Sequence, residues 1–321
     1  MAPAIMRLRS SLRNIWSNLW RKPVAFPIQS YSIETTSSVD DYWNRHTVNS
    51  VPFKTAQESL EYLVWRNNEY PLFPKLMDLY GIHKGETILD YGCGPGNDLV
   101  GYLVHSQAAL VIGMDVSTKA LDLARRRLAL HDIDPARVQL VHKHDTDTTV
   151  HLENASIDHI YCEGVLHHTS DPEGILREFR RVLRPNGTGC IMVYNRDSLW
   201  RHLYVAYVKL VIENAFPGLT VDEAFHRCTD GVECPIAHNY GSDQFSGMCQ
   251  RAGFAVEYRG GYLSKWELQM LEKHGPSAKA DQRLPLEHRD FLNELTIDSQ
   301  GYPMYRGKHA GIGGVYAFRA N

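Results

Sequence analysis

Short apolar runs alternate with stretches of helical periodicity through the middle of the chain. The runs that predict buried strands are residues 88–90, 110–117, 138–141, 157–163 and 189–194. Between them, apolar residues recur at three- and four-residue steps, which predicts helices at residues 99–105, 119–130 and 173–183. Strands that alternate with helices are typical of a mostly parallel sheet. The pattern therefore predicts an α/β fold with a doubly wound sheet.

The flanking segments are less regular. Residues 31–39 are rich in serine and threonine and are typical of a linker, and helical periodicity then covers residues 57–66 and 72–80. Beyond the core, an apolar helical stretch at residues 199–216 is expected to form a lid or a dimer helix. The later predicted elements are a helix at 243–252, a strand at 254–258, an insertion over 263–311 and a last strand at 314–319.

Charge is distributed unevenly along the chain. Five of the 34 basic residues precede the first acid, Glu34, and all 37 acidic residues lie at or beyond it. Within residues 5–22, apolar side chains that include Trp16 and Trp20 would share one face of a helix, with arginines opposite. Such a segment docks to a membrane surface or a partner; a mitochondrial presequence or a loosely packed extension is the alternative. No apolar run is long enough to span a bilayer.

Composition narrows the class of protein. The formal net charge of -3 argues against a surface that binds nucleic acid. The six cysteines include no C-x-x-C pair and no secretory signal is apparent, which favours a cytoplasmic protein with free thiols. Four potential metal ligands lie close in sequence, but their spacing matches no usual zinc pattern, so no metal is predicted. They are His226, Cys228, Cys234 and His238.

A glycine-rich loop follows the first predicted strand of the core. Asp90 ends that strand, and Gly92, Gly94 and Gly96 follow at alternate positions before a helix. Glycine permits a tight turn and close approach of the backbone to a ligand, and the helix start offers free N–H groups. A nicotinamide dehydrogenase would space its glycines G-x-G-x-x-G around a pyrophosphate. The early third glycine and the preceding acid instead favour an ammonium or sulfonium ligand group.

Four motifs follow one another in the core: LDYGCGPG at 89–96, GMDVS at 113–117, EGVLHHTSDP at 163–172 and REFRRVLRPNG at 177–187. In their order and spacing the chain resembles the class I S-adenosylmethionine-dependent methyltransferases, in particular the methyltransferase type 11 group. The resemblance implies a Rossmann-like sheet of seven strands whose last strand is antiparallel to its neighbours.

The resemblance also implies S-adenosylmethionine as the cofactor. Asp90 would orient its methionine amino group, and Glu163 would line the methionine side of the pocket. Gly92, Gly94 and Gly96 would let the backbone approach the amino-acid and ribose end.

The adenosine end would be held by residues that follow the next two strands. Asp115, with Val116 beside it, would accept hydrogen bonds from the ribose hydroxyls, as its place at a strand end also suggests. Asp145 would meet the adenine amino group. Asp147 is the alternative for that contact, because the segment after it lacks the apolar-proline sequence that is usual in the family.

These assignments divide the chain into four expected parts. They are a basic amphipathic extension and linker (1–40), a helical pre-domain or lid (41–82), an S-adenosylmethionine-binding core (83–196), and lid insertions with the strands that complete the sheet (197–321).

Methyl transfer to a hydroxyl requires alignment of donor and acceptor and removal of a proton. His167 and His168 follow the fourth predicted strand, at the edge of the sheet where ligands bind, and histidine titrates near neutrality. His168 is the preferred base, and a structural role near the cofactor is the alternative for both. Tyr194, Asn195 and the segment 305–309 are further candidates for acceptor contact.

The expected function is O-methylation of a small-molecule or carbohydrate acceptor. C-methylation of a quinone-like or lipid-linked acceptor at a membrane is one alternative. A catalytically inactive cofactor-binding scaffold is another, because fold alone does not establish catalysis. A homodimer is the expected assembly if residues 199–216 form a dimer helix.

Overall fold

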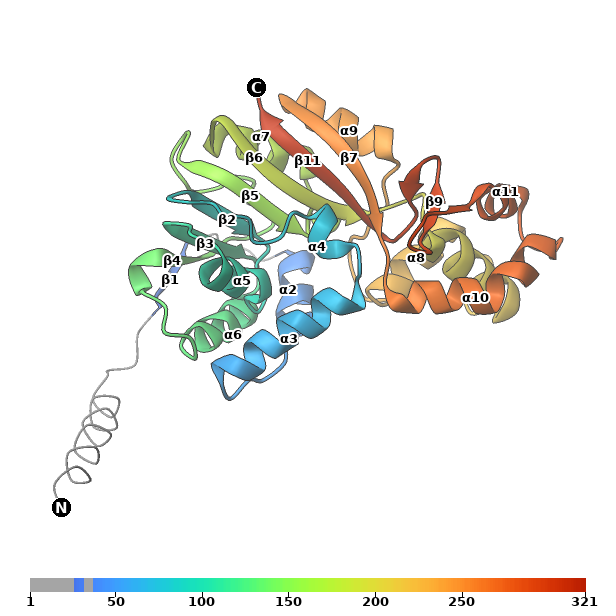
Figure 1. Cartoon of the computed structure of the whole chain (residues 1–321), viewed down its shortest axis with the longest axis horizontal. Coiled ribbons are helices and arrows are strands. Elements are labelled where there is room, and N and C mark those ends of the chain that lie inside the picture. The colour runs from blue at the N-terminus through green and yellow to red at the C-terminus, as the bar shows by residue number, and fades with distance from the viewer. Residues whose placement is uncertain (1–25, 32–36) are drawn as a thin grey trace, which may run out of the picture.

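The sheet at the centre of the molecule has eight strands. A computed structural model describes residues 26–31 and 37–321, and its main sheet has the order β1-β4-β3-β2-β5-β6-β11-β7 (Figure 1). Neighbouring strands are parallel, except that β11 is antiparallel to both β6 and β7. The predicted antiparallel last strand is therefore confirmed. The strands are β1 Ile28–Ser30, β2 Thr87–Tyr91, β3 Leu110–Asp115, β4 Val138–His142, β5 Ile157–Glu163, β6 Leu183–Tyr194, β7 Phe254–Tyr262 and β11 Gly313–Ala320.

Seven of these strands form the sheet that the family resemblance implied, and β1 is an addition. β1 pairs in parallel with β4, with Ile28 opposite Leu140. It lies in the segment that was expected to be extension and linker. The sequence did not predict this strand, because three residues are too few to show a periodic pattern. The amphipathic stretch at residues 5–22 lies outside the described residues.

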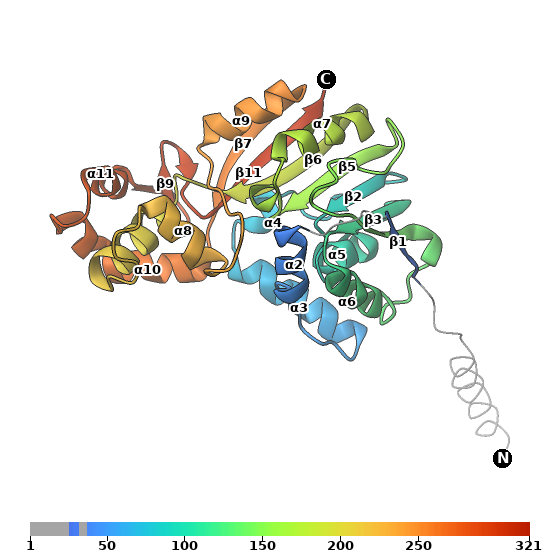
Figure 2. The same cartoon turned by 180° about the vertical axis from the view of Figure 1, so that it is seen from behind.

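Helices cover both faces of the sheet (Figures 1 and 2). Successive strand residues alternate between two cores: Ile88 packs with α5 and α6, and Leu89 packs with α7 and α9. This is the doubly wound arrangement, and the bounds of these four helices fall within two residues of the predicted ones. The helices are α5 Asn97–His105, α6 Thr118–Leu128, α7 Pro172–Val182 and α9 Ser242–Arg251, and short 3₁₀ helices lie at η1 Pro135–Arg137 and η2 Leu166–His168.

The helices before the core differ from the predicted ones in two ways: α2 begins inside the predicted linker, and α4 is shorter than the predicted stretch at residues 72–80. Ser37 and Asp40 form a capping box, in which each side chain accepts from the other's backbone N–H, so α2 starts inside the predicted linker. Positive φ angles of 53° at Asp78 and 57° at Tyr80 are incompatible with a helix, so α4 cannot extend over residues 72–80. The helices are α2 Ser38–Arg45, α3 Ala56–Glu69 and α4 Phe73–Leu76.

The two insertions form a lobe beside β7 and β11 (Figure 1). Its centre is a π-helix, η3, which covers most of the predicted helix at 199–216 and contacts α8, α10 and α11. Within residues 26–31 and 37–321, every helix is too short or too polar to cross a membrane. The elements of the lobe are η3 Trp200–Ile212, α8 Val221–Thr229, α10 Lys265–Ala280, α11 Leu286–Glu294 and a small sheet of β8 Thr296–Ile297, β9 Pro303–Tyr305 and β10 Lys308–His309.

A buried carboxyl in the first turn of α10 makes stability depend on pH. Glu267 is 1% exposed and accepts hydrogen bonds from the N–H groups of Ser264 at 2.8 Å and Ile312 at 3.1 Å. Burial raises its pKa from 4.5 to about 7. Between these values the folded chain holds more protons than the unfolded chain, so we expect the free energy of unfolding to fall by about 3 kcal/mol as pH rises. Urea unfolding at pH 5 and pH 8 measures this decrease in the free energy of unfolding. An equal decrease in Glu267→Gln would contradict its assignment to Glu267.

Candidate functional site

A cavity of about 730 Å³ lies at the carboxyl ends of β2, β3, β5 and β6. The strand ends, the glycine-rich loop, α2 and the lobe all contribute side chains to its wall. In open α/β sheets, ligands bind at this edge. Of the residues assigned first to the cofactor or to the base, all except Gly96 and His167 line the cavity.

The glycine-rich loop has the left-handed backbone that its composition predicts. Gly92, Gly94 and Gly96 have φ angles of 80°, 51° and 80°. The Gly92 N–H donates to the Met114 carbonyl at 2.7 Å, and the Gly94 N–H donates to Asp115 Oδ2 at 2.8 Å. The loop is thereby anchored to the end of β3. Gly96 is the N-cap residue of α5 and shapes the turn without lining the cavity.

Gly92 tolerates no side chain. A Cβ at this position would lie 2.1 Å from a methyl group of Val165, and the φ of 80° adds strain for any other residue. We expect Gly92→Ala to lower the free energy of unfolding by about 2–5 kcal/mol, measured by urea denaturation. Gly85→Ala is the control, because Gly85 has a similar φ of 74° but nothing within 4 Å of the added Cβ. Equal losses in both variants would show that the contact with Val165 is unimportant.

Asp90 and Glu163 make one end of the cavity acidic. Asp90 is 2% exposed, and its Oδ2 has no hydrogen-bond partner among the described residues. Burial raises its pKa well above the usual range, and nearby Asp98 adds to the effect. Glu163 accepts from the Tyr262 hydroxyl at 2.7 Å, and burial raises its pKa as well. Because buried carboxylates are stabilised by a nearby positive charge, this end of the cavity suits a cationic ligand group.

Asp115 retains acceptor capacity for a ligand. Its Oδ1 accepts from the Ser117 N–H and its Oδ2 from the Gly94 N–H, both at 2.8 Å. Burial raises its pKa, and these backbone hydrogen bonds oppose the shift. Each carboxylate oxygen has two lone pairs, so each can accept one more hydrogen bond. Val116 lines the wall beside it.

Asp145 lines the cavity, whereas Asp147 does not. Asp145 Oδ1 accepts from the Ser170 N–H at 3.2 Å, and its Oδ2 has no partner in the part of the chain that is described. Its own N–H donates to Asp40 Oδ1 at 2.9 Å, which joins the loop after β4 to α2. Asp147 is paired with His151. Of the two acids that the sequence left open for adenine, the placement favours Asp145.

The two histidines of η2 are placed differently. His168 lines the cavity, and its Nδ1 lies 2.6 Å from the Ile236 carbonyl oxygen. Its Nε2 lies 3.6 Å from Asp230 Oδ1. His167 is fully buried outside the wall, and its ring centroid lies 3.7 Å from that of Tyr194. Of these two histidines, only His168 is therefore in a position to contact a ligand in this cavity.

A buried ion pair beside Asp90 was not predicted. Arg66 of α3 makes a two-pronged contact with Asp98 of α5, with Nη1 donating to Oδ2 at 3.0 Å. The Tyr80 and Tyr161 hydroxyls also donate to Asp98. Burial favours the neutral form of Asp98, but Arg66 and the hydrogen bonds overcome this and lower its pKa. Neither residue stands in a recognisable motif, and charged residues on helices usually face solvent, so the sequence carries no signal for this pair.

The other residues that were predicted to contact the methyl acceptor do not lie together. Tyr194 lines the cavity and donates to Asp230 Oδ1 at 2.9 Å. Asn195 is buried and donates to the Gly311 carbonyl at 3.0 Å, so it joins two strand ends. Residues 307–309 border a separate hollow of about 370 Å³.

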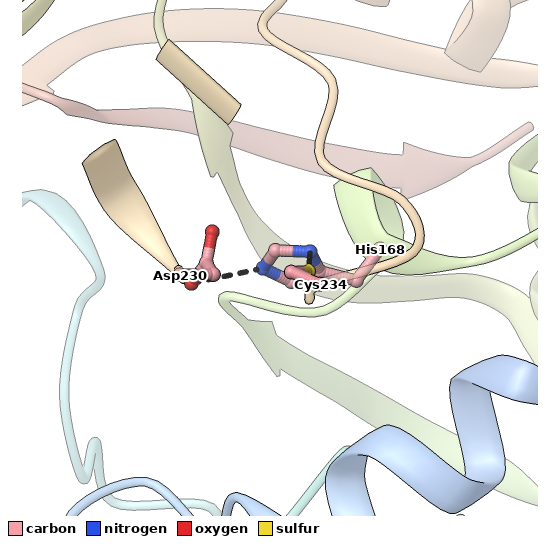
Figure 3. A group of neighbouring side chains, drawn as sticks. All are labelled: His168, Asp230 and Cys234. Carbon is pink, nitrogen blue, oxygen red and sulfur yellow. Dashed lines mark hydrogen bonds and ion pairs between the residues drawn. The ribbon is translucent and has the colours of Figure 1, made fainter. Parts of the chain in front are cut away.

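Three side chains of ligand type meet near the cavity: His168, Asp230 and Cys234, within 4.8 Å of one another (Figure 3). Cys234 Sγ lies 3.9 Å from Nδ1 of His168, whereas Asp230 faces Nε2. Nδ1 is also bonded to a backbone carbonyl. A metal ion needs donors that converge on one point, and these donors are directed at opposite sides of the ring.

Comparisons with known proteins agree with this geometry. Residues 89–191 match the family model described as a methyltransferase domain. An uncharacterized 37.1 kDa protein in transposon TN4556 of Streptomyces fradiae is 36% identical over 184 residues, which are 56% of this chain and 47% of that protein. The ubiquinone biosynthesis O-methyltransferase of Neisseria meningitidis serogroup C is 28% identical over 137 residues, 42% of this chain and 56% of that protein. The chain spans about half the length of the curated relatives it matches.

A solved structure extends the likeness to most of the fold. Haemonchus contortus phosphoethanolamine N-methyltransferase 2, in complex with S-adenosyl-L-methionine, has a TM-score of 0.51 at 16% identity and covers 89% of this chain and 60% of its own. The central parallel strands and the antiparallel last strand of this sheet fit that fold. Residues 89–191 of this chain match a methyltransferase domain, and the sheet that contains them has the Rossmann-like fold of the solved S-adenosylmethionine-dependent methyltransferases.

Proposed function

We propose that this protein binds S-adenosylmethionine and methylates a hydroxyl group of a small, uncharged acceptor. The observation that carries the proposal is the placement of three acids along one cavity. Asp90 and Asp145 each have a buried oxygen without a partner among the described residues, and Asp115 has spare acceptor capacity. A buried unpaired acceptor is costly, so these oxygens call for donors from a ligand.

The residues present fit the cofactor. Asp90 would hold its ammonium group with Glu163 close by, Asp115 would hold the ribose hydroxyls, and Asp145 would hold the adenine amino group. When bound, S-adenosylmethionine supplies a methyl group on a sulfonium, which is a good leaving group. The protein then contributes alignment of the acceptor and removal of its proton.

The described residues of the wall offer no free permanent cation for an anionic acceptor. Its described lysine and arginine residues are Lys143 and Arg66. Arg66 is paired with Asp98, and the Lys143 ammonium donates to the carbonyls of His144 and Asp147. A phosphate or carboxylate would therefore lack a partner, which favours an uncharged acceptor.

Aromatic side chains from three elements line the same cavity and suit an apolar ring face. They are Tyr42 and Trp43 of α2, Tyr194 of β6 and Trp200 of η3. Aromatic rings pack well against planar or apolar ligand faces. The Neisseria relative is named as an O-methyltransferase, which agrees with a hydroxyl acceptor. We therefore favour a small phenolic or glycosidic hydroxyl as the methyl acceptor.

Calorimetric titration of the full chain with S-adenosylmethionine, S-adenosylhomocysteine and NADH tests the cofactor. We expect both adenosyl ligands to bind and NADH not to bind. Turnover is then measured as release of S-adenosylhomocysteine with catechol and with methyl α-D-glucopyranoside as hydroxyl probes. Absence of adenosyl binding would overturn the proposal. Binding without turnover on hydroxyl probes would favour a cofactor-binding scaffold.

A further inference from the structure

Asp230 lies in the cavity wall beside His168 (Figure 3). It follows directly after α8, so the lobe brings this carboxyl group onto the core. His168 Nε2 lies 3.6 Å from Asp230 Oδ1, and the Tyr194 hydroxyl donates to the same oxygen at 2.9 Å. Three segments that are far apart in the sequence therefore meet around one carboxylate.

The position of the proton on His168 follows from its neighbours. A carbonyl oxygen only accepts hydrogen bonds, so the 2.6 Å contact between Nδ1 and the Ile236 carbonyl requires a proton on Nδ1. The neutral ring then has only a lone pair at Nε2, and this lone pair faces Asp230 Oδ1. Two acceptors that face each other repel unless a proton lies between them. His168 and Asp230 are therefore arranged to take up one proton together.

We propose that His168 and Asp230 act as a single proton acceptor for the methyl-accepting hydroxyl; this rests on the proposed methyltransferase function. As the acceptor oxygen forms its bond to the methyl carbon, the carbon–sulfur bond breaks and its electron pair goes to sulfur. The hydroxyl proton passes to His168 Nε2, and Asp230 stabilises the imidazolium. Tyr194 holds the Asp230 carboxylate in position. The proton is released to solvent after transfer.

The surroundings keep the pair free of this proton at neutral pH. Burial lowers the pKa of His168 to about 4 and raises that of Asp230 to about 6. A proton that both groups bind belongs to the pair and not to either residue. Both pKa values lie below 7, so at pH 7 the pair does not carry this proton and can accept it. The titratable groups that face the pair are Tyr42, His167, Tyr194, His226, Cys234 and His238.

An NMR titration of the whole protein tests the pair without any acceptor. The ¹⁵N-labelled chain is titrated from pH 2 to pH 9, and the His168 ring signals are identified by their loss in His168→Gln. We expect the His168 midpoint to fall by at least about one pH unit in Asp230→Asn, a tenfold loss of proton affinity. The reason is that the carboxylate that stabilises the imidazolium is removed. An unchanged midpoint in the folded variant would overturn the proposal.

Two further variants sharpen this titration. Glu233→Gln is the matched control, because Glu233 lies on the same segment with a side chain that is 66% exposed; it should leave the midpoint unchanged. Tyr194→Phe is the second test of the pair and is used if Asp230→Asn fails to fold. Loss of the hydroxyl leaves the Asp230 carboxylate less stabilised, so the pair should bind its proton more tightly and the midpoint should rise. A midpoint at the wild-type value would count against the pair.

The catalytic role is measured with whichever hydroxyl probe turns over. We expect Asp230→Asn to lower kcat about 100-fold without changing S-adenosylmethionine affinity, and to move the acid limb of the pH–rate profile to lower pH. An unchanged kcat and profile would overturn the proposal. Absence of S-adenosylmethionine binding by the wild type would instead refute the function on which it rests. If the protein bound Zn²⁺ stoichiometrically and Cys234→Ser abolished that binding, these side chains would form a metal site and the proposal would be overturned.

Discussion

Asp115→Ala is expected to weaken the binding of S-adenosylmethionine by about 100- to 1000-fold. The carboxylate would accept two charge-assisted hydrogen bonds from the ribose, each worth roughly 1.5–3 kcal/mol. Its loss also leaves the N–H groups of Gly94 and Ser117 without their acceptor, which loosens the loop that surrounds the cofactor. Isothermal titration calorimetry with S-adenosylmethionine and S-adenosylhomocysteine measures the change, and both ligands should be affected alike.

Asp122→Ala is the matched control for this experiment. Asp122 lies on α6, about half exposed, and contacts Arg125 one turn further along the same helix. Its removal should change neither binding constant. If Asp115→Ala bound the cofactor as tightly as the wild type, the assignment of the ribose site to this residue would be wrong.

Arg66→Met is expected to lower the free energy of unfolding by about 3–5 kcal/mol. The substitution keeps an unbranched side chain of similar length but leaves the Asp98 carboxylate buried without its cation. The hydroxyls of Tyr80 and Tyr161 would still donate to Asp98, but the ionic contact between α3 and α5 would be lost. Urea unfolding followed by circular dichroism at neutral pH measures the loss.

Two variants separate this effect from the loss of a long side chain. In the double variant Arg66→Met, Asp98→Asn the buried charge is removed as well, so part of the stability should return. Arg125→Met breaks an exposed ion pair with Asp122 and should cost less than about 1 kcal/mol. A loss in Arg66→Met no larger than in Arg125→Met would show that the buried pair contributes little.

The gathering of four predicted acids along one cavity could be predicted, because they come at or just after the ends of consecutive parallel strands. Asp90 and Asp115 lie at the ends of β2 and β3, Asp145 follows β4, and Glu163 ends β5. Parallel strands bring their carboxyl ends to one edge, so a local pattern of apolar run and acid is enough to gather these side chains. Which of Asp145 and Asp147 lines the cavity depends on how the loop after β4 folds, and the local sequence does not determine this.

The surroundings of His168 were not predictable in the same way. Asp230 lies 62 residues beyond His168 in the sequence, and only the packing of the lobe on the core brings the two together. Arg66 and Asp98 likewise meet through the contact of α3 with α5. His167 and His168 are adjacent in sequence, and only the course of η2 decides which of them lines the cavity. Local periodicity contains no information on such pairings.

The short strand β1 protects one edge of the sheet. An open edge presents unpaired N–H and C=O groups that can pair with another chain. Residues 28–30 occupy this position along residues 140–142 of β4. All described residues that line the cavity lie at or beyond Val39, so a chain shortened by its first 31 residues would keep every one of them. It would, however, expose β4 and acquire a tendency to aggregate edge to edge.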